Sequence, residues 1–101
     1  MKWMVYAVFD VAAGVYDRPF VAHGDPSAKR SFGDIAVSAD HPIGKHPQDF
    51  TLFRIGTYDD NSGHIDPEAP AKVVSALECV AQAQKVAPGS LKEEVVLKEV
   101  N

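Results

Sequence analysis

Apolar residues occupy both alternating sets of positions near the start of the chain. Residues 3–9 are W-M-V-Y-A-V-F, so an extended chain carries apolar side chains on both of its faces. This pattern is typical of a strand at the centre of a sheet, or of one covered on both sides. Asp10 and Gly14 then favour a turn. We therefore predict a hairpin across 10–15, followed by short extended pieces at 15–16 and 20–22.

A helix is predicted from Pro26 to about Val37. Asp25 precedes Pro26, and an aspartate carboxylate accepts a free backbone N–H at a helix start, while the fixed φ of proline suits the first helical position. Helical spacing predicts that Ala28, Phe32, Ile35 and Ala36 pack on the sheet, and that Lys29, Arg30 and Asp34 face water. The prolines of 41–47 predict a loop, with one helical turn starting at Pro47.

Residues 50–58 predict a second strand because they are rich in aromatic and β-branched side chains, F-T-L-F-R-I-G-T-Y. The expected core positions in it are Phe50, Leu52, Phe53 and Ile55. Gly56 indicates a close backbone approach or a bulge. Residues 59–63, D-D-N-S-G, predict a hairpin turn that leads into His64 and Ile65.

A second helix is predicted after this hairpin. Asp66-Pro67 repeats the cap-and-proline signal, and Pro70 offers an alternative start. Pro88 and Gly89 end the predicted helix near Val86. Its apolar stripe consists of Val73, Val74, Leu77, Val80 and Ala81.

These elements predict a single α+β domain over residues 1–89. Its fold is expected to be a small antiparallel sheet of three to five strands covered by two helices. Residues 90–101 carry Ser90 and Glu93 at capping-box spacing among mixed charges. Three interpretations of this tail stay open: a short terminal helix, an added strand or a frayed, disordered end.

The composition limits the kinds of partner. The chain of 101 residues is 46% hydrophobic, and 14 acidic against 10 basic residues give a formal charge of −4. The whole molecule therefore has no field that attracts nucleic acid or an anionic membrane, and any anion site must be a local patch. Cys79 alone cannot form an internal disulfide, and neither a secretory leader nor a membrane-spanning apolar run is visible. We expect a cytosolic protein.

No motif predicts catalysis, a cofactor or a metal site. His41 and His46 each precede a proline in a loop and have no cysteine pair beside them, which favours loop histidines over a zinc site. Cys79 lies at the border of an apolar stripe and is interpreted as a small core residue, not a nucleophile. Residues 59–63 lack the later glutamate of a calcium loop. We expect a non-enzymatic protein.

Cations and aromatic rings supply the remaining candidate surface. Binding of a single nucleic-acid strand requires cations for the phosphates and exposed rings on which bases stack. The competing interpretation is that the rings are core and the cations form a solvated face. The candidate nucleic-acid-binding residues are Arg18, Lys29, Arg30, Lys45, Arg54, Tyr16 and Tyr58.

Five short motifs occur in order along residues 2–66. They are Y-x-x-x-D near the start, Y-x-R-P-F at 16–20, K-R-S-F at 29–32, H-P-Q-D-F-T-L-F-R-I-G-T-Y-D at 46–59, and S-G-H-I at 62–65. In this respect the chain resembles the small nonstructural protein of gokushoviruses, the single-stranded DNA phages of the Microviridae. The resemblance implies an early or replication-stage protein that binds DNA, and it implies no catalytic residues.

The leading functional hypothesis is therefore binding of single-stranded DNA, or of a complex of DNA with a replication protein, without catalysis. The event would be the switch from duplex replication to production of the genome strand, in the cytoplasm of the bacterial host. The alternative is a homodimeric adaptor that engages the phage replication initiator, a capsid protein or a host protein through an apolar face, which suits the acidic pI better. A small enzyme is the third hypothesis.

Overall fold

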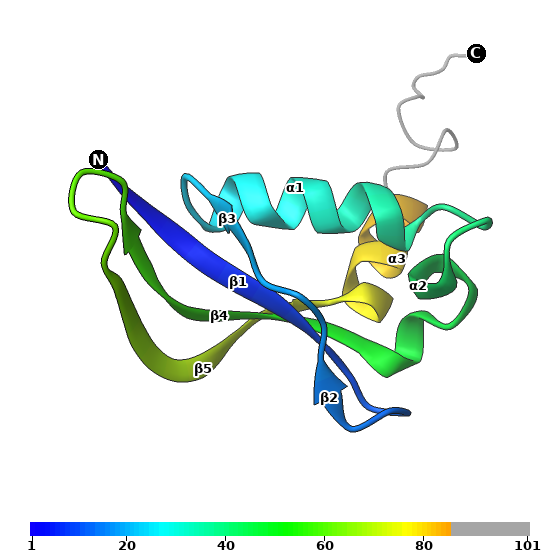
Figure 1. The fold of residues 1–101 in the computed structure, drawn as a ribbon. Helices are drawn as coiled ribbons and strands as arrows, with labels where there is room; N and C mark the ends of the chain where they lie inside the picture. The colour runs from blue at the N-terminus through cyan, green and yellow to red at the C-terminus, as the bar shows by residue number, and fades with distance from the viewer. Residues whose placement is uncertain (86–101) are drawn as a thin grey trace, which may run out of the picture.

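Five strands form one antiparallel sheet in the computed structural model of this protein, which describes residues 1–85 (Figure 1). The sheet confirms the predicted α+β class and antiparallel arrangement. The predicted tail and the predicted helix end near Val86 lie outside the described residues. The strands are β1 (Lys2–Asp10), β2 (Val15–Tyr16), β3 (Phe20–Ala22), β4 (Phe50–Asp59) and β5 (Ile65–Ser75).

β1 lies at the centre of the sheet, as its two apolar faces predict. Its one edge pairs with β2 and β3 and its other edge pairs with β4, which in turn pairs with β5. Both predicted hairpins are present, and each has a glycine with positive φ in its turn: Gly14 at 73° and Gly63 at 77°. An L side chain rarely adopts this conformation, so glycine suits both turns.

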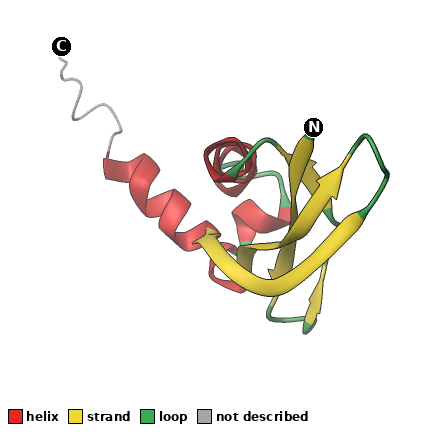
Figure 2. Ribbon diagram, turned by 90° about the vertical axis from the view of Figure 1, so that its left-hand side faces the viewer, coloured by secondary structure: helices red, strands yellow, loops and turns green. Residues whose placement is uncertain are grey.

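Three α-helices and one 3-10 turn lie on the same side of the sheet (Figures 1 and 2). They are α1 (Asp25–Ala36), α2 (Pro42–Lys45), α3 (Ala76–Lys85) and the turn Pro47–Asp49. The helix predicted after Asp25 and the helical turn predicted at Pro47 are confirmed. The loop prediction for 41–47 is wrong in part, because the imidazole Nδ1 of His41 accepts the N–H of Ile43 and starts the short helix α2.

The predicted role of Asp25 as helix cap is also wrong. The N-cap residue of α1 is Gly24, which has no side chain, so no side-chain hydrogen bond caps this helix. Asp25 lies in the first turn, where its carboxylate accepts the hydroxyl of Tyr6 at 2.6 Å. An acidic residue still stabilises this helix end through the helix dipole, and here it also ties α1 to the sheet.

The second helix begins about ten residues later than the Asp66-Pro67 signal predicts. Residues 65–75 form the edge strand β5, and α3 starts at Ala76. The start is set by a capping box: the hydroxyl of Ser75 accepts the N–H of Glu78 at 3.0 Å, and the Glu78 carboxylate accepts the N–H of Ser75 at 2.8 Å. Pro67 is tolerated because it lies in an edge strand, where an N–H need not join a ladder.

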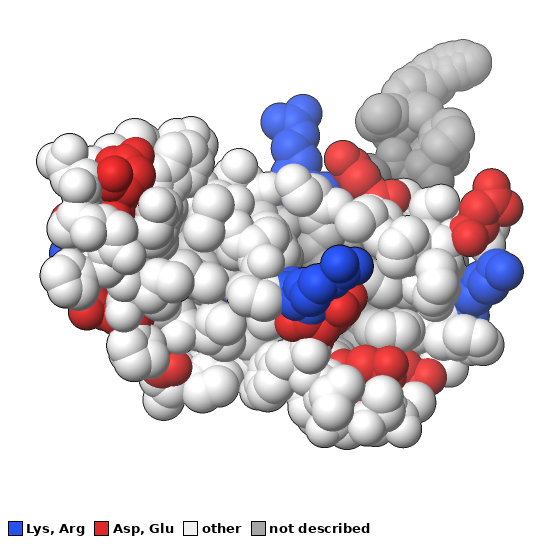
Figure 3. Space-filling model, viewed as in Figure 1, with Lys and Arg blue, Asp and Glu red and all other residues white. Residues whose placement is uncertain are grey.

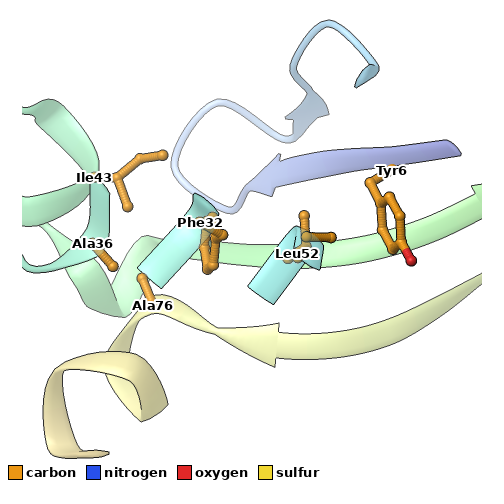
Figure 4. Packing of buried hydrophobic residues seen from close by; sticks show 7 residues of the cluster. Tyr6, Phe32, Ala36, Ile43, Leu52 and Ala76 are labelled. Atoms are coloured by element: carbon orange, nitrogen blue, oxygen red, sulfur yellow. The ribbon is translucent and has the colours of Figure 1, made fainter. Parts of the chain in front are cut away.

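The core lies between the sheet and α1 (Figure 4). Tyr6 from β1 and Leu52 from β4 are fully buried, and they meet Phe32 of α1 and Ile43 of α2 in one cluster. The predicted sheet-facing positions of α1 are confirmed except Ile35, which is 37% exposed. The remaining members of the cluster are Ala28, Ala36 and Ala76.

Gly56 confirms the predicted close approach. A Cβ at this position would lie 2.5 Å from the carbonyl oxygen of Asp66 on β5. The register between β4 and β5 also shifts between Arg54 and Gly56. A side chain at position 56 would therefore push the two strands apart, which only glycine avoids.

Candidate nucleic-acid interface

The side chains of β1 alternate between the two faces of the sheet. Met4, Tyr6 and Val8 belong to the core cluster or pack against it, on the side of the helices. The intervening residues, Trp3, Val5, Ala7 and Phe9, therefore lie on the opposite face. No helix of residues 1–85 covers that face (Figure 2). We call it the open sheet face.

Strand register places more aromatic side chains on the open sheet face, because residues directly opposite each other in neighbouring strands point to the same side. The cross-strand pairs on this face are Trp3 with Tyr58, Val5 with Val21, Ala7 with Phe53, and Phe9 with Tyr16. The open sheet face is therefore rich in rings, and it also carries Thr51 opposite Phe9 and Lys72 opposite Phe53.

Three of these rings contact one another at one end of β1. The ring centroids of Phe9 and Tyr16 are 4.8 Å apart, those of Tyr16 and Phe53 are 5.7 Å apart, and those of Phe9 and Phe53 are 6.4 Å apart. Tyr16 is the outermost ring and is 42% exposed. We call this group the Tyr16 cluster. It presents a fixed aromatic surface to solvent.

A second aromatic contact lies at the other end of β1. The imidazole of His23 stacks on the indole of Trp3, with ring centroids 4.3 Å apart and an interplanar angle of 30°. The indole Nε1 donates to a carboxylate oxygen of Asp60 at 3.0 Å, and the amine of Met1 donates to the other oxygen at 2.8 Å. These hydrogen bonds hold the pKa of Asp60 below its usual range. The indole is therefore fixed in position.

The sequence-predicted cations do not gather beside these rings. Lys29 and Arg30 line a groove of about 570 Å³ between α1 and α3. Arg18 lies beside a depression formed with α1 and α2, and Lys45 ends α2. Arg54 is opposite Tyr6 in the register, on the helix side, with its Nε 3.4 Å from the carboxylate of Glu68. In Figure 3, basic atoms form separate patches with acidic atoms between them.

Tyr16 and Tyr58 are the two predicted site residues that register places on the open sheet face. The prediction that the five cations bind phosphate stays a prediction. Lys72, which the sequence did not single out, is opposite Phe53 in the register, and its ammonium lies 3.3 Å from the Glu78 carboxylate. The structure thus separates the rings from the groove that Lys29 and Arg30 line, and the cation beside Phe53, Lys72, is paired with Glu78.

The sequence did not single out Trp3, His23 and Phe9, whose rings take part in these contacts. Phe53, which was expected in the core, is not part of the core cluster and contacts Tyr16 instead. A signal for this face was available in the sequence: residues 3–9 carry apolar side chains on both faces of the strand, so both faces favour contact with other groups. Only one face meets the helices of residues 1–85. Phe53 is half-buried among rings on the other face, whereas its neighbour Leu52 is fully buried in the core.

Cys79 is half-buried against the core cluster, beside Gly33 of α1. Burial raises the pKa of its thiol, so the neutral thiol is favoured over the nucleophilic thiolate. Within residues 1–85, no three His, Cys, Asp or Glu side chains are grouped as metal ligands. No helix in this range has the length and apolar character needed to cross a membrane.

Comparison with protein families identifies the chain. The model of the phage ORF5 protein family matches residues 3–79, which run from the second residue of β1 through α1 and α2 to the first turn of α3. The chain therefore belongs to the phage ORF5 protein family. Comparisons with curated proteins and with solved structures found no match.

Proposed function

We propose that this phage protein binds single-stranded DNA through the open sheet face, without catalysis. The Tyr16 cluster carries the proposal, since it holds three contacting rings on a face without a helical cover, and the outermost ring is exposed. An aromatic sheet surface is a common way to bind single strands, because every base has a face that stacks. The fold supplies the rigid support that such stacking requires.

The motif resemblance extends the proposal to the biological setting. It supports a gokushovirus of the Microviridae as the source, and a role when the phage changes from duplex replication to production of its single-stranded genome. We place this event in the cytoplasm of the bacterial host. No step of the proposed binding requires a metal, a cofactor or a catalytic residue.

Stacking must supply most of the affinity. A chain with a formal charge of −4 repels phosphates at long range. Stacking on a ring does not depend on the net charge of the protein, and each stacked base contributes about 1–3 kcal/mol to the binding free energy. We therefore expect weak binding with a shallow dependence on salt.

Substitution of Tyr16 tests the site. Tyr16→Ala removes the exposed ring, and we expect affinity for a labelled oligo(dT), followed by fluorescence anisotropy, to fall by about 5- to 100-fold. Val15→Ala is the matched control: Val15 adjoins Tyr16 in β2, is 57% exposed and points to the other face. Absence of binding by the parent at low salt, or equal loss in both variants, contradicts the proposal.

A homodimeric adaptor is the second candidate function. It is favoured by the aliphatic part of the open sheet face, where Val21 is 48% and Ile65 is 64% exposed. A second copy would cover these side chains without any need for phosphate contacts. Light scattering at high micromolar concentration measures this directly: a dimer mass that Val21→Asp reduces to the monomer supports the adaptor, and a monomer mass for the parent contradicts it.

A further inference from the structure

We propose that Trp3 and His23 form a second base-stacking subsite, and that one DNA strand runs along β1 with a base at each end. This inference rests on the proposed function and deepens it, since it defines the path and the minimum length of the ligand. The first subsite is the Tyr16 cluster. The second lies at the opposite end of the same strand and on the same face.

The Trp3–His23 pair has the geometry of a stacking platform. His23 is exposed, and one side of its ring lies on the indole at 4.3 Å, so its other side is free for a base. The indole beneath is fixed by its hydrogen bond to Asp60. A platform that is already ordered loses little conformational entropy when a ligand binds.

The surface between the two subsites is apolar. Val5 is 7% and Ala7 is 1% exposed, so neighbouring side chains cover both of them. The cross-strand neighbours on this face are Val21 and Gly56 beside Val5, and Phe53 beside Ala7. A strand that passes from one group of rings to the other would therefore lie on apolar side chains along its whole path.

The spacing of the subsites predicts the minimum ligand. Trp3 and Phe9 are six positions apart in β1, which corresponds to about 20 Å at about 3.3 Å per residue. An extended single strand covers this distance with about four nucleotides, at the short end of the range for single-strand-binding modules. A dinucleotide is too short to reach both subsites.

The acidic side chain beside the second subsite is compensated. Asp60 makes an ion pair with the amine of Met1 at 2.8 Å. The platform itself consists of an indole and an imidazole ring and adds no negative charge. A phosphate beside His23 thus faces a neutralised carboxylate.

Trp3 is the only tryptophan of the chain, so its fluorescence reports on this subsite alone. The full chain is titrated with end-labelled oligo(dT) of two, four and eight nucleotides, and both Trp3 emission and label anisotropy are measured. We expect affinity to rise at least tenfold from two to four nucleotides, and the change in Trp3 emission to saturate at a correspondingly lower strand concentration.

Three variants locate the effect. His23→Glu removes the ring and adds a negative charge, and we expect a loss of tenfold or more in affinity for the eight-nucleotide strand. His46→Glu makes the same charge change at an exposed histidine between α2 and the 3-10 turn, and should bind within twofold of the parent. His23→Phe keeps an aromatic ring at this position, so its affinity for the eight-nucleotide strand should be close to that of the parent.

The outcomes separate this inference from the proposed function. Anisotropy changes with constant Trp3 emission, no step in affinity with length, and equal binding by the two glutamate variants would overturn the second subsite while DNA binding stands. Anisotropy that does not change for any strand at low salt would overturn DNA binding itself, and the subsite with it.

Discussion

Residues of β1 that point to opposite faces of the sheet have different environments: one face is buried under the helices and the other carries the contacting rings. Tyr6 is fully buried, and its hydroxyl donates to the Asp25 carboxylate at 2.6 Å. Burial, followed by this hydrogen bond, raises the pKa of Tyr6 far above its usual range, so the hydroxyl stays a neutral donor. Phe9, three positions later, has no part in the core cluster and contacts rings on the open sheet face.

Leu52 and Phe53 give the first prediction, because they are adjacent in β4 and point to opposite faces. Leu52→Ala leaves a cavity in the core and should lower the free energy of unfolding by about 2–5 kcal/mol. Phe53→Ala removes a half-buried ring from the open sheet face and should cost less. Denaturant unfolding of both variants measures the difference.

The DNA affinity of the two variants should follow the reverse order. Phe53→Ala disrupts the Tyr16 cluster and should weaken binding, whereas folded Leu52→Ala should bind like the parent. If Phe53→Ala destabilises as much as Leu52→Ala and leaves binding unchanged, then Phe53 is a core residue after all.

At the scale of elements, the junction between β5 and α3 depends on side chains more than on proline. Ser75 and Glu78 satisfy each other's backbone N–H groups at the first turn of α3. The N–H of Ser75 and, next, the ammonium of Lys72 hold the pKa of Glu78 below its usual range. This contribution to stability is present above the unfolded pKa of Glu78 and is lost as pH falls through the folded one.

Ser75→Ala gives the second prediction. It removes the cap acceptor and should lower the free energy of unfolding by about 1 kcal/mol. Ser31→Ala, at an exposed position of α1, is the control and should change stability by less than about 0.5 kcal/mol. Thermal and denaturant unfolding at neutral pH measure both. Equal effects of the two substitutions would refute a stabilising role for the capping box.

Most elements could be predicted from the sequence because their signals are local. The alternation in 3–9, the glycine turns and the helical spacing after Pro26 are properties of neighbouring residues. Residues 66–75 were predicted as the start of a helix but form a strand. An Asp-Pro pair begins a helix only if the residues after it do not pair with a neighbouring strand. Here β4 offers an edge with which β5 pairs along most of its length, and Ser75 delays the helix start.

The candidate site was harder to predict for a physical reason. A cation is visible in a sequence, but the face on which a ring lies depends on register, and register depends on distant strands. His23 and Trp3 are 20 positions apart and meet only because β3 pairs with β1. The sequence singled out Tyr16 as a candidate ring, whereas its contacts with Phe9 and Phe53 are visible only in the fold.

At the scale of the whole molecule, the cations of the groove between α1 and α3 and the rings of the open sheet face lie on opposite sides of the sheet. Lys29 and Arg30 lie in the groove between α1 and α3, on the helix side of the sheet. The rings lie on the other side of the sheet, where the proposed binding depends on stacking. A strand bound along β1 therefore passes on the far side of the sheet from these two cations.

Lys29→Ala/Arg30→Ala gives the third prediction. Each phosphate contact adds about 0.7 to the slope of log affinity against log salt for a single strand, so two lost contacts would lower the slope by about 1.4. Binding on the open sheet face predicts an unchanged slope and affinity within about twofold. Both side chains are exposed, so stability should change little. Titrations at several salt concentrations measure the slope for the parent and the variant. A slope lower by about 1.4 would instead place the strand on α1, and would confirm the two cations that the sequence predicted.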